Sequence, residues 1–151
     1  MSQPTAGSKI TIVNGAVAAG TTAVTGASVI DMSDYESCRF IFEFGAITAG
    51  QACKCIIAQS NTNPPLTDGT QDAAGSGTTF SDTASTNTGV IIEVQKPLFR
   101  YLLAYINRTS QNVAVNSITA IQAGPKKLPV TQDAVSIAKT TKVISPAVGT
   151  A

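Results

Sequence analysis

The stretch that decides the fold is SDYESCRFIFEFGAITAGQACKCIIAQS, residues 33–60. Three phenylalanines stand at alternate positions in it, and after a break that contains glycine two thiols also stand at alternate positions. Alternation with a period of two is typical of a β-strand with one buried face. We therefore expect two strands, residues 38–44 and 51–59, that pair as a β-hairpin and direct the aromatic side chains into a core.

The same alternation recurs in short runs that are separated by Gly, Pro, Asn and Asp. The further runs are residues 9–13, 28–32, 78–81, 90–94, 99–106 and 113–122. Seven or eight strands at spacings of roughly 8–12 residues are typical of a two-sheet sandwich. We predict an all-β fold: a single antiparallel β-sandwich, jelly-roll-like, over residues 1–124, followed by an extended C-terminal arm over residues 125–151.

Most aromatic residues belong to two of these strands. The two groups are Tyr35, Phe40, Phe42 and Phe44, and then Phe99, Tyr101 and Tyr105. Aromatic side chains bury the largest area per residue, so we expect the two strands to face each other across the core.

The strand at residues 99–106 is apolar on both faces, although a solvated face should be polar. We predict that the face made by Leu102, Ala104 and Ile106 binds a partner, either another subunit or the arm. The alternative is a central strand that the protein's own loops shield.

The arm differs from the body in charge. Residues 125–151 carry four lysines and one aspartate, net +3, whereas residues 1–124 carry six basic and eight acidic residues, net −2. Scattered lysines without arginine or aromatic neighbours do not indicate nucleic-acid binding. An acidic protein surface fits the arm better.

The arm is also too apolar for an inert linker. Pro129, Pro146 and the absence of sustained alternation place it outside the sheet, and a short helix over residues 131–139 with Thr131 as N-cap is expected. A terminus that docks on nothing is the alternative. The residues predicted to contact a partner are Lys126, Lys127, Leu128, Val130, Val135, Ile137, Val143 and Ile144.

The residues that usually carry catalysis are scarce. The chain has no histidine, which removes Ser-His-Asp and Cys-His catalysis and the commonest transition-metal ligand. Its three cysteines, Cys38, Cys53 and Cys55, are odd in number and lack the C-x-x-C spacing, so we interpret them as core thiols. We predict no catalytic residue, no metal, no cofactor and no enzymatic activity.

One catalytic alternative stays open at this point. A small hydrolase could draw on carboxylates, namely Glu43, Glu93 and the loop aspartates Asp68, Asp72 and Asp82.

No apolar run approaches the 18 residues of a membrane span and no secretory signal is recognisable, so we expect neither secretion nor membrane insertion.

Three segments together resemble a group of small β-sandwich proteins encoded among the head genes of tailed bacteriophages and prophages. The segments are residues 30–47 (IDMSDYESCRFIFEFGAI), 93–106 (EVQKPLFRYLLAYI) and 120–131 (AIQAGPKKLPVT). The similar features are a D-x-S-x-Y-E turn, an alternating strand that ends in Gly, and an R-Y pair that opens a later strand. In this chain they are Asp31, Ser33, Tyr35, Glu36, Gly45, Arg100 and Tyr101.

The resemblance implies a capsid cement or decoration protein. Such a protein is made in the host bacterial cytoplasm, forms homo-oligomers and binds the outside of an icosahedral shell built from a separate major capsid protein. The alternative is a phage tail or surface module that binds glycans, for which the polar residues 60–88, with Phe80, would present the site.

Overall fold

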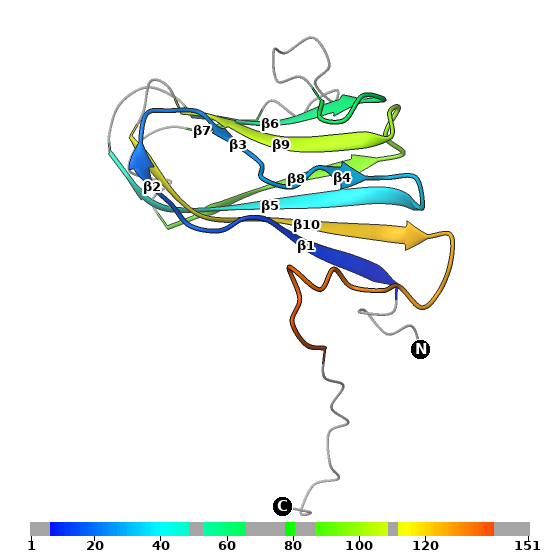
Figure 1. Cartoon of the computed structure of the whole chain (residues 1–151). Coiled ribbons are helices and arrows are strands. Elements are labelled where there is room, and N and C mark those ends of the chain that lie inside the picture. Colours follow the sequence, from blue (N-terminus) through cyan, green and yellow to red (C-terminus); the bar gives the residue numbers. More distant parts are fainter. Residues whose placement is uncertain (1–6, 49–52, 66–77, 81–86, 109–111, 141–151) are drawn as a thin grey trace, which may run out of the picture.

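The computed structural model describes residues 7–48, 53–65, 78–80, 87–108 and 112–140, and every helix or strand element in them is a β-strand (Figure 1). The strands are β1 Ser8–Asn14, β2 Val17–Gly20, β3 Val24–Thr25, β4 Ile30–Asp31, β5 Tyr35–Ile47, β6 Cys53–Ser60, β7 Thr78–Phe80, β8 Gly89–Gln95, β9 Tyr101–Asn107 and β10 Val113–Pro125. They form two antiparallel sheets packed as a β-sandwich, so the predicted fold class is confirmed.

Each sheet has five strands and is four strands wide, because two of its strands share one edge. Sheet A has the order β1-β10-β5-β8, and β2 pairs with β10 beyond the end of β1. Sheet B has the order β3-β9-β6-β7, and β4 pairs with β9 beside β3. The chain crosses between the sheets after β2, β4, β5, β7, β8 and β9, which is the connectivity of a jelly roll.

The predicted count of seven or eight strands was too low. Each of the eight predicted runs overlaps a strand, but β2 and β3 were not predicted. Their sequence, rich in Ala, Gly and Thr, shows no alternation of apolar and polar residues.

The predicted hairpin between residues 38–44 and 51–59 is wrong. β5 lies in sheet A between β10 and β8, whereas β6 lies in sheet B between β9 and β7. Two strands that face each other across a sandwich bury the same alternate side chains as two strands of one hairpin. Alternation therefore could not distinguish the two arrangements.

The core lies between the two sheets, and β5 contributes its largest side chains. Phe40 and Phe42 are 0% exposed and Phe44 is 1% exposed. The three cysteines are also 0% exposed and unpaired, which confirms that they are core thiols. Burial raises the pKa of Cys38 to about 12 and that of Cys53 to about 11, so both stay protonated at neutral pH.

The predicted partner face on residues 99–106 is wrong. Leu102, Ala104 and Ile106 are 0% exposed and belong to the core, because sheet A covers them. The aromatic strands do lie in opposite sheets as expected. However, the side chains that β9 directs into the core are aliphatic, while Tyr101 and Tyr105 are only half-buried.

The first part of the arm follows the free edge of β1. The Gln132 side chain accepts a hydrogen bond from the Ile10 amide (2.9 Å) and donates one to the Ser8 carbonyl oxygen (2.7 Å). The Ser136 hydroxyl oxygen accepts one from the Ile12 amide (3.0 Å). We call Gln132 and Ser136 the edge latch, because they bond groups that an edge strand otherwise leaves to water or to another chain.

The expected helix over residues 131–139 is wrong, since the structure has a single turn there. The Asp133 carbonyl oxygen accepts hydrogen bonds from the amides of Ser136 (3.1 Å) and Ile137 (2.8 Å). The Asp133 carboxylate also accepts from the Ser136 hydroxyl at 2.8 Å. These bonds place the turn at Asp133 rather than at Thr131, and side-chain bonds of this kind compete with a continuing helix.

Candidate functional site

The residues of the resemblance gather mainly at one end of the sandwich. Asp31, at the end of β4, accepts two hydrogen bonds from the Arg100 guanidinium, from Nε at 2.9 Å and from Nη2 at 2.7 Å. The guanidinium carbon of Arg100 lies 5.0 Å from the centre of the Tyr101 ring, within the range of a cation–π contact. The D-x-S-x-Y-E turn and the R-Y pair are therefore in contact, although about seventy residues separate them.

The backbone of the turn is fixed by further bonds. The Ser33 amide donates to the Asp31 carboxylate at 2.9 Å, and the Tyr35 amide donates to the Met32 carbonyl oxygen at 3.1 Å. These bonds hold the turn through which the chain leaves sheet B and enters β5 of sheet A. Gly45 lies near the far end of β5, away from this group.

Electrostatics reinforce the ion pair. The hydrogen bonds from Arg100 lower the pKa of Asp31 to about 2, and Asp31 in turn raises the pKa of Arg100. The side chains are 52% and 41% exposed for Arg100 and Asp31, so water screens the pair and its contribution to stability is modest. Burial, together with the charge of Asp34, raises the pKa of Tyr35.

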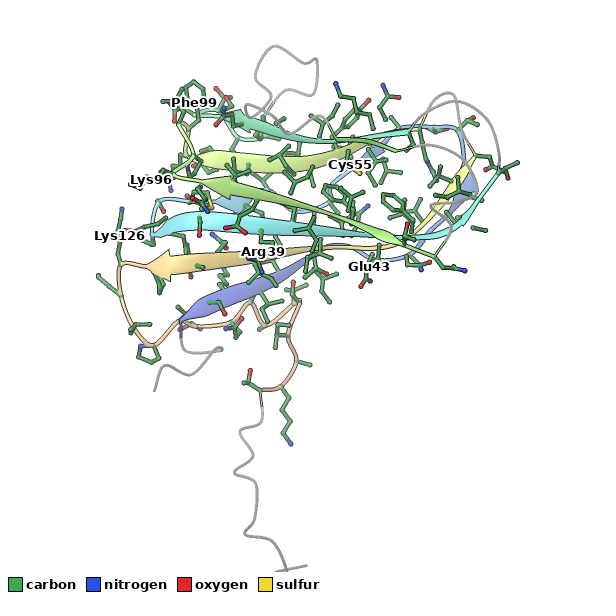
Figure 2. All side chains as sticks on the ribbon, turned by 180° about the vertical axis from the view of Figure 1, so that it is seen from behind. Arg39, Glu43, Cys55, Lys96, Phe99 and Lys126 are labelled. Carbon is green, nitrogen blue, oxygen red and sulfur yellow. The ribbon has the colours of Figure 1, made fainter. Side chains whose placement is uncertain are left out.

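A cleft of about 250 Å³ opens beside this pair, and we call it the motif cleft. Its lining residues are Met32, Tyr35, Glu36, Lys96, Pro97, Leu98, Phe99 and Arg100. Leu98 is 80% exposed, and Figure 2 shows Lys96, Phe99 and Lys126 at the same end of the sandwich. The cleft thus combines an exposed apolar side chain with cations, a combination suited to contact with another surface.

The arm begins next to the D-x-S-x-Y-E turn, which we call the motif turn. The Lys126 amide donates to the Asp34 carbonyl oxygen at 2.9 Å, and its ammonium group donates to the Ser33 carbonyl oxygen. The motif turn therefore fixes the direction in which the chain leaves β10.

The structure places the predicted arm residues in three groups. Lys126, Lys127, Leu128 and Val135 are exposed, with 68% of Leu128 and 95% of Val135 accessible. Val130 and Ile137 are half-buried. Val143 and Ile144 lie outside the described residues.

Sequence reasoning missed two buried polar residues. Arg108 is 5% exposed and donates to three backbone carbonyl oxygens, those of Thr22 (2.5 Å), Ala18 (2.9 Å) and Val113. Gln122 is 2% exposed and donates to the Asp31 carbonyl oxygen at 2.7 Å. Gln122 could have been found from its inward position in the alternating β10, whereas the sequence around Arg108 carries no signal.

Two of the carboxylates considered for a hydrolase, Glu93 and Glu43, interact with different side chains and not with each other. Glu93 is paired with Arg39 at 2.8 Å, and Glu43 accepts a hydrogen bond from the Ser117 hydroxyl at 2.5 Å. Asp68, Asp72 and Asp82 lie outside the described residues, as does most of the loop considered for glycans. The Phe80 side chain is likewise not described.

In the described part of the chain, no group of three or more His, Cys, Asp or Glu side chains could hold a metal ion. None of the described residues belongs to a helix that could span a bilayer. No protein-family model matches this chain, and no curated protein matches it either. The site is therefore interpreted from its own geometry.

Proposed function

We propose that this protein is a capsid cement or decoration protein that binds the outside of an icosahedral phage shell through non-covalent contacts. The resemblance of residues 30–47, 93–106 and 120–131 suggests this role. The contact between Asp31 and Arg100 supports this role, because it joins two parts of the resemblance that are far apart in the sequence.

The observation that carries the proposal is the geometry of the arm. Residues 126–136 are anchored to the body at Lys126 and at the edge latch, yet Leu128 and Val135 are directed into solvent. A chain held in place while it exposes large apolar side chains presents them at fixed positions, and burying them against a partner would remove apolar area from water. Lys126 and Lys127 beside Leu128 would favour an acidic protein surface.

The proposed mechanism is binding linkage. A protein that binds only the assembled shell stabilises that shell against dissociation, by an amount set by its concentration relative to its dissociation constant. Contacts among neighbouring copies on the shell would add to this through multivalency. The proposed partners are therefore the major capsid protein and other copies of this chain, and the proposed location is the virion exterior.

The test uses shells assembled from the proposed partner, the major capsid protein. The variant Leu128→Ser with Val135→Ser changes two exposed arm side chains and leaves the edge latch intact. Lys54→Ser is the control, because Lys54 is exposed on the body and belongs neither to the arm nor to the lining of the motif cleft.

We expect wild-type protein to co-sediment with shells and to raise their melting temperature. The double variant should lose most of both effects, whereas the control should keep them. Absence of wild-type binding would refute the proposed function, and unchanged binding by the double variant would refute the role of the arm.

A further inference from the structure

The outer face of sheet A carries a row of three isoleucines and one threonine that crosses the whole sheet. Ile12 pairs with Thr119, Thr119 pairs with Ile41, and Ile41 pairs with Ile91. Residues paired across antiparallel strands point to the same face, so these four side chains form one line on β1, β10, β5 and β8. We call this line the isoleucine row.

The row points away from the core. Neighbours of Ile41 in the strand, Phe40 and Phe42, are 0% exposed and fill the space between the sheets, so Ile41 must point outward. The two ends of the row are the most accessible, with Ile12 45% and Ile91 63% exposed. On a solvated face of an antiparallel sheet these positions should be polar, yet three of the four are isoleucine.

Opposite charges flank the row on β5. Arg39 and Glu43 lie two residues before and after Ile41, on the same outer face and about 7 Å from it along the strand. Figure 2 shows both side chains along β5. Arg39 pairs with Glu93 in the same molecule, but within the described residues no lysine or arginine forms a salt bridge with Glu43.

We infer that this face binds the same face of a second copy, about a twofold axis that runs along the isoleucine row. Such an axis lies in the interface and reverses the strand direction of the second copy, so each β5 faces its symmetry mate. Arg39 of one copy then faces Glu43 of the other, twice per dimer, and Ile41 meets Ile41. A twofold contact of this kind needs a self-complementary surface, and the order Arg39, Ile41, Glu43 provides one.

Axes parallel to the strands leave Glu43 without a cation. A parallel axis between β10 and β5 would place Arg39 against Ile121 of the other copy, because Ile121 is its partner across the sheet. It would also place Glu43 against Ser117, its cross-strand partner. A parallel axis between β5 and β8 would place Arg39 against Glu93, with which it already pairs in its own molecule, and Glu43 against Gly89. Of these three axes, the one along the row alone places a cation opposite Glu43.

The contact is small. Four strands about 4.8 Å apart and seven residues of about 3.3 Å each give a face of roughly 15 by 23 Å. A stable complex buries about 800 Å² on each partner. This face is smaller, so we expect a dimer dissociation constant that is micromolar or higher. This inference rests on the contact between copies that the proposed function includes and specifies its surface, and its test uses no shell, so it can fail while shell binding stands.

A charge-reversal cycle tests the inference by sedimentation equilibrium from micromolar to millimolar concentrations. Arg39→Glu and Glu43→Arg each place like charges opposite one another, and each should raise the dimer dissociation constant by about tenfold or more. The double variant restores opposite charges and should recover dimerisation. Lys54→Glu, an exposed charge reversal on the outer face of sheet B, is the matched control and should change nothing.

A second measurement avoids the loss of any charge. Facing sheets lie about 10 Å apart, so a bismaleimide of similar length should join two copies of Ile41→Cys across the axis. The native thiols are 0% exposed and should not react, and Lys54→Cys should give no covalent dimer. A wild-type monomer at millimolar concentration, a double variant that fails to recover, or equal cross-linking at both positions would overturn the inference while leaving shell binding untouched.

Discussion

Replacing Gln132 with alanine removes both hydrogen bonds with which this side chain closes the edge of β1. The bonds join Gln132 to the Ile10 amide at 2.9 Å and to the Ser8 carbonyl oxygen at 2.7 Å. Each is worth about 0.5–1.5 kcal/mol net, and both are only partly buried, so water replaces part of them. We expect a loss of about 1 kcal/mol and, for a chain of this length, a fall in melting temperature of about 2–4 °C.

Amide hydrogen exchange measured by NMR provides the sharper assay. In Gln132→Ala the Ile10 amide becomes an open edge group, and about 1 kcal/mol corresponds to roughly fivefold faster exchange. The Ile12 amide should change less, because Ser136 still accepts its hydrogen bond. Thr11 serves as the internal control, since strand geometry directs its amide toward β10.

A matched substitution separates the two bonds. Gln132→Glu keeps an acceptor for Ile10 and loses the donor to Ser8, so exchange at Ile10 should stay near the wild-type rate. Thr131→Ala, an exposed neighbour, should leave every amide of β1 unchanged. If Gln132→Ala does not alter exchange at Ile10, the arm does not protect this edge and our reasoning is wrong.

Three further predictions concern the body. Phe42→Ala removes a side chain that is 0% exposed and should cost about 3–5 kcal/mol in urea denaturation, whereas Ile91→Ala on the surface should cost far less. The pKa of Asp31 falls from 3.8 unfolded to about 2 folded, so its contribution is present above pH 3.8 and is lost as the pH falls toward 2. Because the side chain is 41% exposed, we expect about 1 kcal/mol or less, and Asp31→Asn should lower stability near neutral pH and flatten this acid dependence. The three thiols should resist a thiol reagent in the native state and all react in urea; rapid reaction of any one would contradict its burial.

The sequence was most informative where one face of a strand is clearly apolar. The alternation in β5 identified both the strand and its core side chains, and the isolated thiols were correctly interpreted as buried. The assignment failed on β9, where both faces are apolar and neither could be recognised as the outer one. Burial is decided there by sheet A, whose side chains cover Leu102, Ala104 and Ile106.

Features that depend on distant parts of the chain were not predictable from the sequence alone. Nothing near Gln132 indicates that its amide bonds Ser8 and Ile10, more than a hundred residues earlier. The contact of Asp31 with Arg100 likewise requires β4 to pair with β9. The isoleucine row became visible only with the register, because its members come from four separate strands.

The position of β10 has a consequence for how the chain folds during synthesis. β10 is the last strand of the described residues, yet it lies inside sheet A and pairs with β1, β2 and β5. A ribosome adds about 5–20 residues per second, so β1 waits on the order of ten seconds for the strand that completes it. Until β10 is synthesised, β1 and β2 lack their partner strand in sheet A, and their unpaired edges can bind other chains. Correct folding then depends on a low concentration of nascent chains or on chaperones.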